Sequence, residues 1–202
     1  MSDVLYYVHD PMCSWCWGFR PVWEDMQKRL PATLEVKYVL GGLAPDNDQL
    51  MPEALQKTIQ AHWSNIEEKI PGTRFNHDFW TQCSPRRSTY PACRAVIAAR
   101  ECDTDAERAM ILAIQQAYYL EAKNPSNDDV LINCAEKIGL GVKKFSELLT
   151  SESVRQQLSH ELNVSRQLGV KKFPSLVFKR GGEFKHLQID YNSAENILQK
   201  LR

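Results

Sequence analysis

The stretch Cys13-Ser14-Trp15-Cys16 follows a short apolar run, Val4 to Val8, which predicts the first strand. The two cysteines fall where this strand gives way to the first predicted helix. Thiols three residues apart on the first turn of a helix are close enough to form a disulfide. The first thiol also faces the unpaired N–H groups of the helix N-terminus, which favour a thiolate. Cys13 is therefore the candidate nucleophile and Cys16 the candidate resolving thiol.

The residues that follow predict a βαβ unit. Pro21 to Leu30 has the pattern of a helix, which should end before Pro31. Leu34 to Leu40 alternates in hydropathy, as a strand does. The spacing permits two parallel strands joined by a right-handed crossover. Cys13 then lies at the carboxyl edge of the first strand, where α/β sheets commonly carry their sites.

The middle of the chain, from about Asp46 to Leu168, has almost exclusively helical patterns. Thr104 and Glu107 have the spacing of a capping box ahead of one helix. Asn127 and Ser151 are candidate N-caps of two later helices. We find no repeat and no low-complexity linker in this region.

The strand pattern returns after Gly169. Ser175 to Lys179 and Phe184 to Ile189 are predicted strands, joined by a hairpin turn that contains two glycines. A short helix with Ser193 as its cap is predicted to run to Leu201.

The order βαβ, helical block, ββα predicts an α/β protein with a thioredoxin fold and a large helical insertion after the second strand. The thioredoxin-like domain is expected to comprise residues 1–44 and 155–202, and the helical insertion residues 45–154. One sheet then contains strands from both parts of the thioredoxin-like domain.

The composition excludes several classes of partner. Lys plus Arg and Asp plus Glu number 25 each, and this balance predicts neither nucleic acid nor an anionic membrane as a partner. No apolar run approaches the roughly 18 residues that span a bilayer, and the start Met-Ser-Asp-Val lacks the features of a secretory signal. We therefore expect a cytoplasmic protein. In a reducing compartment, the six cysteines should serve catalysis, metal binding or burial rather than stable disulfides.

Four motifs spread over nearly the whole chain carry a resemblance to a known family. They are CSWCWGF (residues 13–19), LGGL (40–43), YPACRA (90–95) and GVKKFPS (169–175). On these motifs the chain resembles the DsbA-like thioredoxin superfamily, and within it the cytoplasmic FrnE-related group of predicted protein-disulfide isomerases. The resemblance implies thiol–disulfide exchange with protein or small thiol substrates and a thioredoxin- or glutathione-type electron donor. It implies no cofactor beyond the redox-active disulfide, unless glutathione acts as a co-substrate.

The resemblance also assigns a role to Phe173-Pro174-Ser175. A proline at a strand start by itself indicates only a turn or an edge. In thioredoxin-like folds, a cis-proline at this place lies against the Cys-x-x-Cys pair and leaves the preceding backbone free to pair with a substrate peptide. The cis form of Pro174 is thus an expectation from the family, since only about 5–6% of X-Pro bonds in proteins are cis.

The chain departs from the family pattern at two places. Many DsbA-like proteins have a histidine between the cysteines and a small residue before the proline, where this chain has Ser14-Trp15 and Phe173. The thiolate loses a cationic neighbour, so the sequence does not fix the direction of exchange. A cytoplasmic location favours reduction or isomerisation.

Other residues near the motif have two interpretations each. His9 and Asp10 precede the motif, where either could shuttle a proton or perturb Cys13, although polar residues also commonly fill such turns. Aromatic residues could form an apolar rim for an unfolded peptide or a thiol cofactor, or could simply pack in the core. These substrate-binding candidates are Trp15, Trp17 and Phe173.

A Cys-x-x-Cys pair is also a common half of a zinc site. A second closely spaced pair is missing, because the remaining cysteines are Cys83, Cys93, Cys102 and Cys134. We therefore predict no metal site. These four cysteines lie in apolar helical contexts and are expected to be buried thiols. A disulfide between Cys83 and Cys93 is an alternative without support in the sequence.

Three functions are compatible with these residues. The preferred one is a thiol–disulfide oxidoreductase or isomerase. A second is a glutathione-dependent isomerase or transferase of the kappa-class or 2-hydroxychromene-2-carboxylate isomerase type, but those enzymes use a serine-type site, and the intact pair Cys13 and Cys16 argues against that chemistry. The third is a non-catalytic peptide-binding module.

Overall fold

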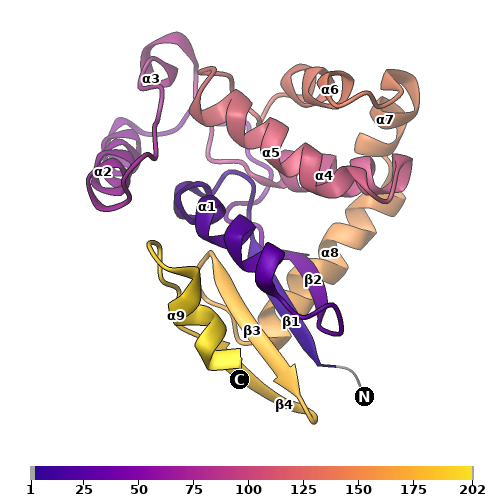
Figure 1. Ribbon diagram of the computed structural model, residues 1–202. Coiled ribbons are helices and arrows are strands. Elements are labelled where there is room, and N and C mark those ends of the chain that lie inside the picture. Colours follow the sequence, from indigo (N-terminus) through magenta and orange to yellow (C-terminus); the bar gives the residue numbers. More distant parts are fainter. Residues whose placement is uncertain (1–2, 202) are drawn as a thin grey trace.

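The computed structural model describes residues 3–201, and Figure 1 shows how their elements are arranged. In chain order the elements are β1 (Val4–His9), α1 (Ser14–Arg29), β2 (Glu35–Leu40), α2 (Glu53–Lys69), α3 (Phe79–Gln82), α4 (Tyr90–Cys102), α5 (Ala106–Tyr119), α6 (Asp128–Lys137), α7 (Val142–Leu149), α8 (Glu152–Gln167), β3 (Ser175–Arg180), β4 (Glu183–Leu187), α9 (Ala194–Leu198) and the 3₁₀ turn η1 (Gln199–Leu201). This order confirms the predicted sequence of elements.

The strands of the described residues form one mixed sheet in the order β2-β1-β3-β4. β1 and β2 are parallel, from Val4 opposite Glu35 to His9 opposite Leu40. β3 runs antiparallel to β1, and β4 antiparallel to β3. This is the thioredoxin arrangement that the order of elements predicts, with α2 to α8 inserted between β2 and β3.

Helices cover both faces of the sheet. α1 and α9 lie on one face (Figure 1), where their apolar side chains pack with those of β1 and β3. α8 packs against β2 on the other face. The largest fully buried side chains between the sheet and α1 are Leu5, Phe19 and Met26.

The helical insertion has a core that continues into the thioredoxin-like part. Most residues of α4 are small and buried, and α5, α7 and α8 pack against this helix. The same cluster includes Met12 and Trp17 beside the cysteine pair, so the insertion packs against the segment that carries the cysteines. The predicted division between residues 154 and 155 falls within the first turn of α8.

Two details of the helices differ from the sequence prediction. α1 is a single helix with Pro21 inside it, so Pro21 does not open a helix of its own. The packing of a buried apolar stripe, which includes Val22 and Trp23, outweighs the hydrogen bond that a proline cannot donate. The capping box at Thr104 is wrong, because the N-cap of α5 is Asp105 and the carboxylate of Glu107 binds Arg100 instead.

Two of the other predicted N-caps, Ser151 and Ser193, are confirmed. Ser151 accepts a hydrogen bond from the N–H of Val154, and Ser193 caps α9 in the same way. Asn127 occupies the N-cap position of α6, but its side-chain oxygen accepts a hydrogen bond from Arg86 instead of capping the helix. Gly169 has a φ of +69° just after α8, which is the left-handed conformation that ends many helices.

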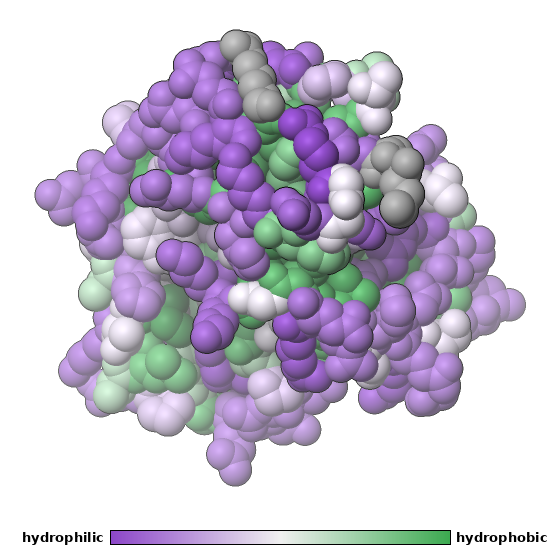
Figure 2. Space-filling view, turned by 90° about the horizontal axis from the view of Figure 1, so that it is seen from below, coloured by the Kyte–Doolittle hydropathy of each residue, from purple (hydrophilic) through white to green (hydrophobic). Residues whose placement is uncertain are grey.

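Hydrophilic side chains cover most of the face shown in Figure 2, and hydrophobic ones appear in smaller areas between them. Among residues 3–201, no helix combines the length and the apolar character that crossing a membrane requires.

One buried carboxylate connects the insertion to the sheet. Glu161 of α8 accepts a hydrogen bond from the N–H of Leu40 at 2.7 Å and one from the guanidinium of Arg100 at 2.6 Å. Leu40 is the last residue of β2 and Arg100 belongs to α4, so Glu161 joins three elements. Hydrogen bonds to a charged group in such a place are stronger than those between neutral groups.

We predict that Glu161→Gln lowers the free energy of unfolding by about 2–4 kcal/mol, because one carboxylate oxygen becomes an amide that faces a donor. Urea denaturation measures the loss. Glu147→Gln, at an exposed position on α7, is the control and should stay within about 0.5 kcal/mol of wild type. An equal effect of the two substitutions would contradict the role given to Glu161.

Candidate active site

The two cysteines occupy the start of α1. Cys13 is the N-cap residue, and its N–H donates to the carbonyl of Asp10 at 3.0 Å. Both cysteines are free thiols, with Cys13 5% exposed and Cys16 0% exposed. Burial, followed by the hydrogen bond with Cys13, raises the pKa of Cys16 well above its ordinary value. Cys16 is therefore protonated at neutral pH, which is compatible with the predicted role of a resolving thiol.

The Phe173–Pro174 peptide bond is cis, as the family resemblance implies. The Cys13 thiol donates to the carbonyl oxygen of Phe173 at 3.5 Å. Two segments that are 160 residues apart in the chain thus meet at the sulfur of Cys13.

The LGGL motif places two glycines, Gly41 and Gly42, where the backbone passes close to other side chains. A Cβ on Gly41 would lie 2.0 Å from a ring carbon of Phe173, so a larger residue just after β2 would have to displace that ring. Gly42 has a φ of +61°, and a Cβ there would meet Leu162 and Tyr90. The loop after β2 therefore packs against the Phe173–Pro174 segment.

A buried carboxylate organises the turn before the cysteines. Asp10 accepts hydrogen bonds from the N–H groups of Met12 and Leu43, each at 2.7 Å. It also accepts from the hydroxyl of Thr89 at 2.7 Å and from the thiol of Cys93 at 3.6 Å. Burial raises the pKa of Asp10, and the hydrogen bonds partly oppose that shift. The sequence patterns assigned no role to Thr89 or Cys93, since nothing local links them to Asp10.

His9 is a buried aromatic group with an exposed fraction of 1%. Its ring stacks on Tyr7 with centroids 5.0 Å apart and lies edge-on to Tyr38 at 5.7 Å. Neither ring nitrogen has a hydrogen-bond partner within the described part of the chain, and burial lowers the pKa of His9 to about 3. His9 is thus neutral at physiological pH and makes no hydrogen bond with either cysteine, so the structure offers no support for a proton shuttle through it.

The three aromatic candidates lie in different surroundings. Trp15 and Phe173 are half-buried. The ring of Trp15 contacts that of Tyr191, with the ring centroids 5.1 Å apart. Trp17 is only 6% exposed, and its indole N–H donates to the carbonyl of Arg74. Trp17 also stacks on Tyr119 of α5, so its placement favours the packing alternative.

A groove of about 480 Å³ lies beside the cis-proline. Phe173, Pro174 and Ser175 form one wall, and residues between β4 and α9, including Ile189 and Tyr191, form the other. Because Trp15 contacts Tyr191, this groove borders the first turn of α1.

The remaining cysteines only partly follow the prediction. Cys93 and Cys134 are buried as expected, but Cys83 and Cys102 are half-buried. Burial raises the pKa of Cys134 to about 11 and that of Cys93 well above the ordinary range, which makes both poor nucleophiles. The Cys83 thiol donates to the carbonyl of Ala122 and not to Cys93, so the alternative disulfide finds no support. Residues 3–201 contain no group of three or more His, Cys, Asp or Glu side chains that could hold a metal ion.

A family model described as "Thioredoxin" matches residues 6–199. The chain belongs to the thioredoxin family. Among solved structures, it is similar to a "putative protein disulfide isomerase from Nitrosomonas europaea", with a TM-score of 0.86 and 27% identity over 100% of this chain and 96% of that chain. This thioredoxin-family fold is DsbA-like, as the sequence predicts.

Two further relatives of this thioredoxin-family chain are informative. The "cytosolic disulfide reductase DsbM from Pseudomonas aeruginosa" has a TM-score of 0.76 and 26% identity over 92% of this chain and 89% of that chain, and DsbM is also known in a structure with GSH. The "ClpXP adapter protein SpxH" of Halalkalibacterium halodurans is 25% identical over 178 residues, which are 86% of this chain. The chain spans only 58% of the length of that relative.

We predict that Gly41→Ala destabilises the protein by about 1–3 kcal/mol, because the added methyl group must displace the ring of Phe173. Chemical denaturation measures the change. Gly141→Ala is the matched control, since a Cβ there meets no atom within 4 Å. If both variants lose the same stability, the close approach at Phe173 is not the cause.

The pKa of His9 predicts an acid-labile contribution to stability. Because that pKa falls from 6.5 in the unfolded chain to about 3 in the folded one, the unfolded state binds the extra proton between these pH values. The contribution of His9 to the free energy of unfolding is therefore at its full value above pH 6.5. It falls by about 1.4 kcal/mol per pH unit as the pH drops from 6.5 towards 3. His9→Phe should remove this slope, as measured by urea denaturation at several pH values.

His62→Gln, at an exposed position on α2, is the control for this measurement and should keep the wild-type slope. An unchanged slope in His9→Phe would show that His9 is protonated alike in both states.

Proposed function

We propose that this protein is a thiol–disulfide oxidoreductase that acts on protein or small thiol substrates through Cys13 and Cys16. The observation that carries the proposal is the thiol of Cys13 at the N-cap of α1, in contact with the carbonyl that precedes a cis-proline. The names of the disulfide isomerase and disulfide reductase relatives support the same reaction class.

The reaction begins when the Cys13 thiolate attacks one sulfur of a substrate disulfide. The substrate S–S bond breaks, its second sulfur leaves as a thiolate that takes up a proton, and a mixed disulfide with Cys13 forms. Cys16 then loses its proton and attacks the Cys13 sulfur. This step releases the substrate as a dithiol and leaves a Cys13–Cys16 disulfide, so two electrons have passed to the substrate.

The substrate is proposed to bind along the groove beside Pro174. Phe173 and Trp15 provide half-buried apolar surface there, and the backbone of the Phe173–Pro174 segment lies next to the reactive sulfur. An extended peptide fits such a place because backbone hydrogen bonds orient it without demanding a particular sequence. Trp17 is left out of this binding surface because it is buried.

A thiol donor must return the Cys13–Cys16 disulfide to the dithiol. We propose a glutathione- or thioredoxin-type donor, and the DsbM structure with GSH supports glutathione as a co-substrate. A cytoplasmic setting and the name of DsbM favour reduction as the net direction. The FrnE-related subgroup implied by the motifs stays a prediction.

The similarity to SpxH supports a second candidate, a protein-binding module that does not need the thiols. The same groove would then hold a segment of a partner protein. The two candidates differ in whether they require the two thiols. Peptide binding would survive in a Cys13→Ser, Cys16→Ser double variant, whereas disulfide reduction would not.

We predict that Cys13→Ser lowers insulin-disulfide reduction by at least about a hundredfold, because a hydroxyl replaces the nucleophilic thiolate. Cys16→Ser should instead accumulate mixed disulfides with the substrate, since the resolving thiol is gone. Gel electrophoresis under non-reducing conditions and intact-protein mass measure the trapped species.

Cys83→Ser is the control, because Cys83 is half-buried and bound to Ala122 outside the site. It should retain full activity and trap nothing. Full activity in both Cys13→Ser and Cys16→Ser would overturn the proposed function.

A further inference from the structure

A second cavity lies on the side of α1 that faces the helical insertion. This inner cavity, of about 380 Å³, is bounded by α1, α5 and the first two strands, and Cys16 is part of its lining. It shares no lining residue with the groove beside Pro174. Its volume falls in the range of small-molecule sites, which is about 300–1,000 Å³.

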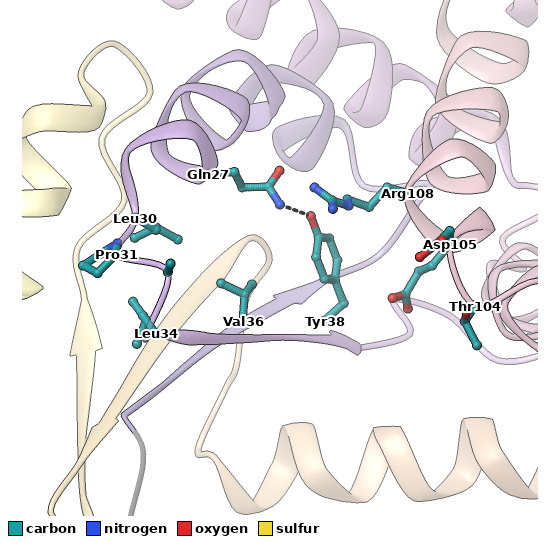
Figure 3. Close-up of a pocket in the computed structure, with 11 residues that line it drawn as sticks. Gln27, Leu30, Pro31, Leu34, Val36, Tyr38, Thr104, Asp105 and Arg108 are labelled. Atoms are coloured by element: carbon teal, nitrogen blue, oxygen red, sulfur yellow. Dashed lines mark hydrogen bonds between the residues drawn. The ribbon is translucent and has the colours of Figure 1, made fainter.

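An outer cavity of about 570 Å³ continues from the inner one. Gln27, Tyr38 and Arg108 line both cavities and so mark their junction. Figure 3 shows the side chains of Gln27 and Arg108 directed toward the hydroxyl of Tyr38.

The junction offers two donors without acceptors. The Tyr38 hydroxyl accepts from the indole N–H of Trp23 at 2.9 Å and from the amide of Gln27 at 2.8 Å, which leaves its own hydrogen to donate. Arg108 is exposed and makes no hydrogen bond or ion pair in the described chain, and the carboxylate of its neighbour Glu107 binds Arg100. A guanidinium beside a phenol O–H is a favourable place for a carboxylate.

Besides the three junction residues, the inner cavity is lined by apolar side chains, by the Arg20–Glu24 ion pair and by the amide of Gln115. Its walls include Trp23, Ile111 and Leu112, so they suit an aromatic or aliphatic body. Gln115 is only 2% exposed, and its side-chain oxygen is buried without a hydrogen-bond partner in the described chain. Such an orphaned acceptor is costly in a protein interior, and a ligand with a donor would satisfy it.

We infer that the inner cavity binds a small apolar carboxylic acid that carries a hydrogen-bond donor at its far end. The carboxylate would lie between Arg108 and Tyr38, the apolar body against Trp23 and Leu112, and the donor at Gln115. The bound molecule would lie next to Cys16, away from the proposed substrate groove. The inference does not depend on the proposed reaction of Cys13.

The inference can be tested with 3-(4-hydroxyphenyl)propionate, whose carboxylate and phenol stand at opposite ends of an apolar body. Isothermal titration calorimetry on the reduced, full-length protein should detect binding. Two analogues, 3-phenylpropionate without the donor and 3-(4-hydroxyphenyl)propan-1-ol without the charge, should each bind about tenfold more weakly.

Four variants then assign the contacts. Arg108→Ala should weaken binding of the acid at least about tenfold, and Ala109→Trp should abolish it by filling the exposed mouth of the cavity. Gln115→Met should reduce the preference for the phenol over 3-phenylpropionate to less than about twofold. Arg155→Ala, at an exposed arginine on α8, is the matched control and should bind as wild type does.

Binding that is equal in wild type, Arg108→Ala and Ala109→Trp would overturn the inference, because the acid would then bind elsewhere. No detectable heat with wild type at about 10 mM acid, which corresponds to a binding free energy weaker than about 3 kcal/mol, would overturn it as well. Far-UV circular dichroism and melting curves confirm that each variant is folded.

Discussion

Much of the geometry of the site depends on the buried carboxylate of Asp10. Its hydrogen-bond donors come from the turn before α1, from Leu43 in the loop after β2, and from Thr89 and Cys93 at the start of α4. A buried carboxylate without partners costs several kcal/mol, so these segments must be in place together. The turn that presents Cys13 is therefore coupled to the helical insertion, and the insertion is part of what shapes the site.

The same interaction explains a cysteine that takes no part in the chemistry. Burial raises the pKa of Asp10 from the low ordinary value of a carboxyl, and it raises the pKa of Cys93 well above the higher ordinary value of a thiol. The proton between them therefore stays on sulfur, and Cys93 acts as a donor to the carboxylate. A thiol suits this place because it is small and mostly apolar, so it fits a fully buried helix face while still donating one weak hydrogen bond.

Local sequence patterns predicted the strands, the order of elements and the cap at Ser151, because each of these depends on near neighbours in the chain. The spacing of Cys13 and Cys16 likewise predicted two thiols at a helix start, and the structure places Cys13 at the N-cap of α1. The contact of Cys13 with Phe173 came only from family resemblance, since 160 residues separate them. The capping box at Thr104 failed for a different reason, because the helix begins one residue later, at the N-cap Asp105, and the carboxylate of Glu107 binds the guanidinium of Arg100 at the end of α4.

The different burial of the two thiols has a consequence for the proposed reaction. Cys16 has an exposed fraction of 0% and Cys13 one of 5%, so a thiol or disulfide that arrives along the groove beside Pro174 meets Cys13 first. A substrate joined to Cys13 is then released either by Cys16 or by a second thiol that attacks the substrate side of the mixed disulfide. Because burial raises the pKa of Cys16, its attack requires loss of a proton in a poorly solvated place. Resolution, rather than the first attack by Cys13, is therefore the step on which the surroundings of Cys16 act most directly.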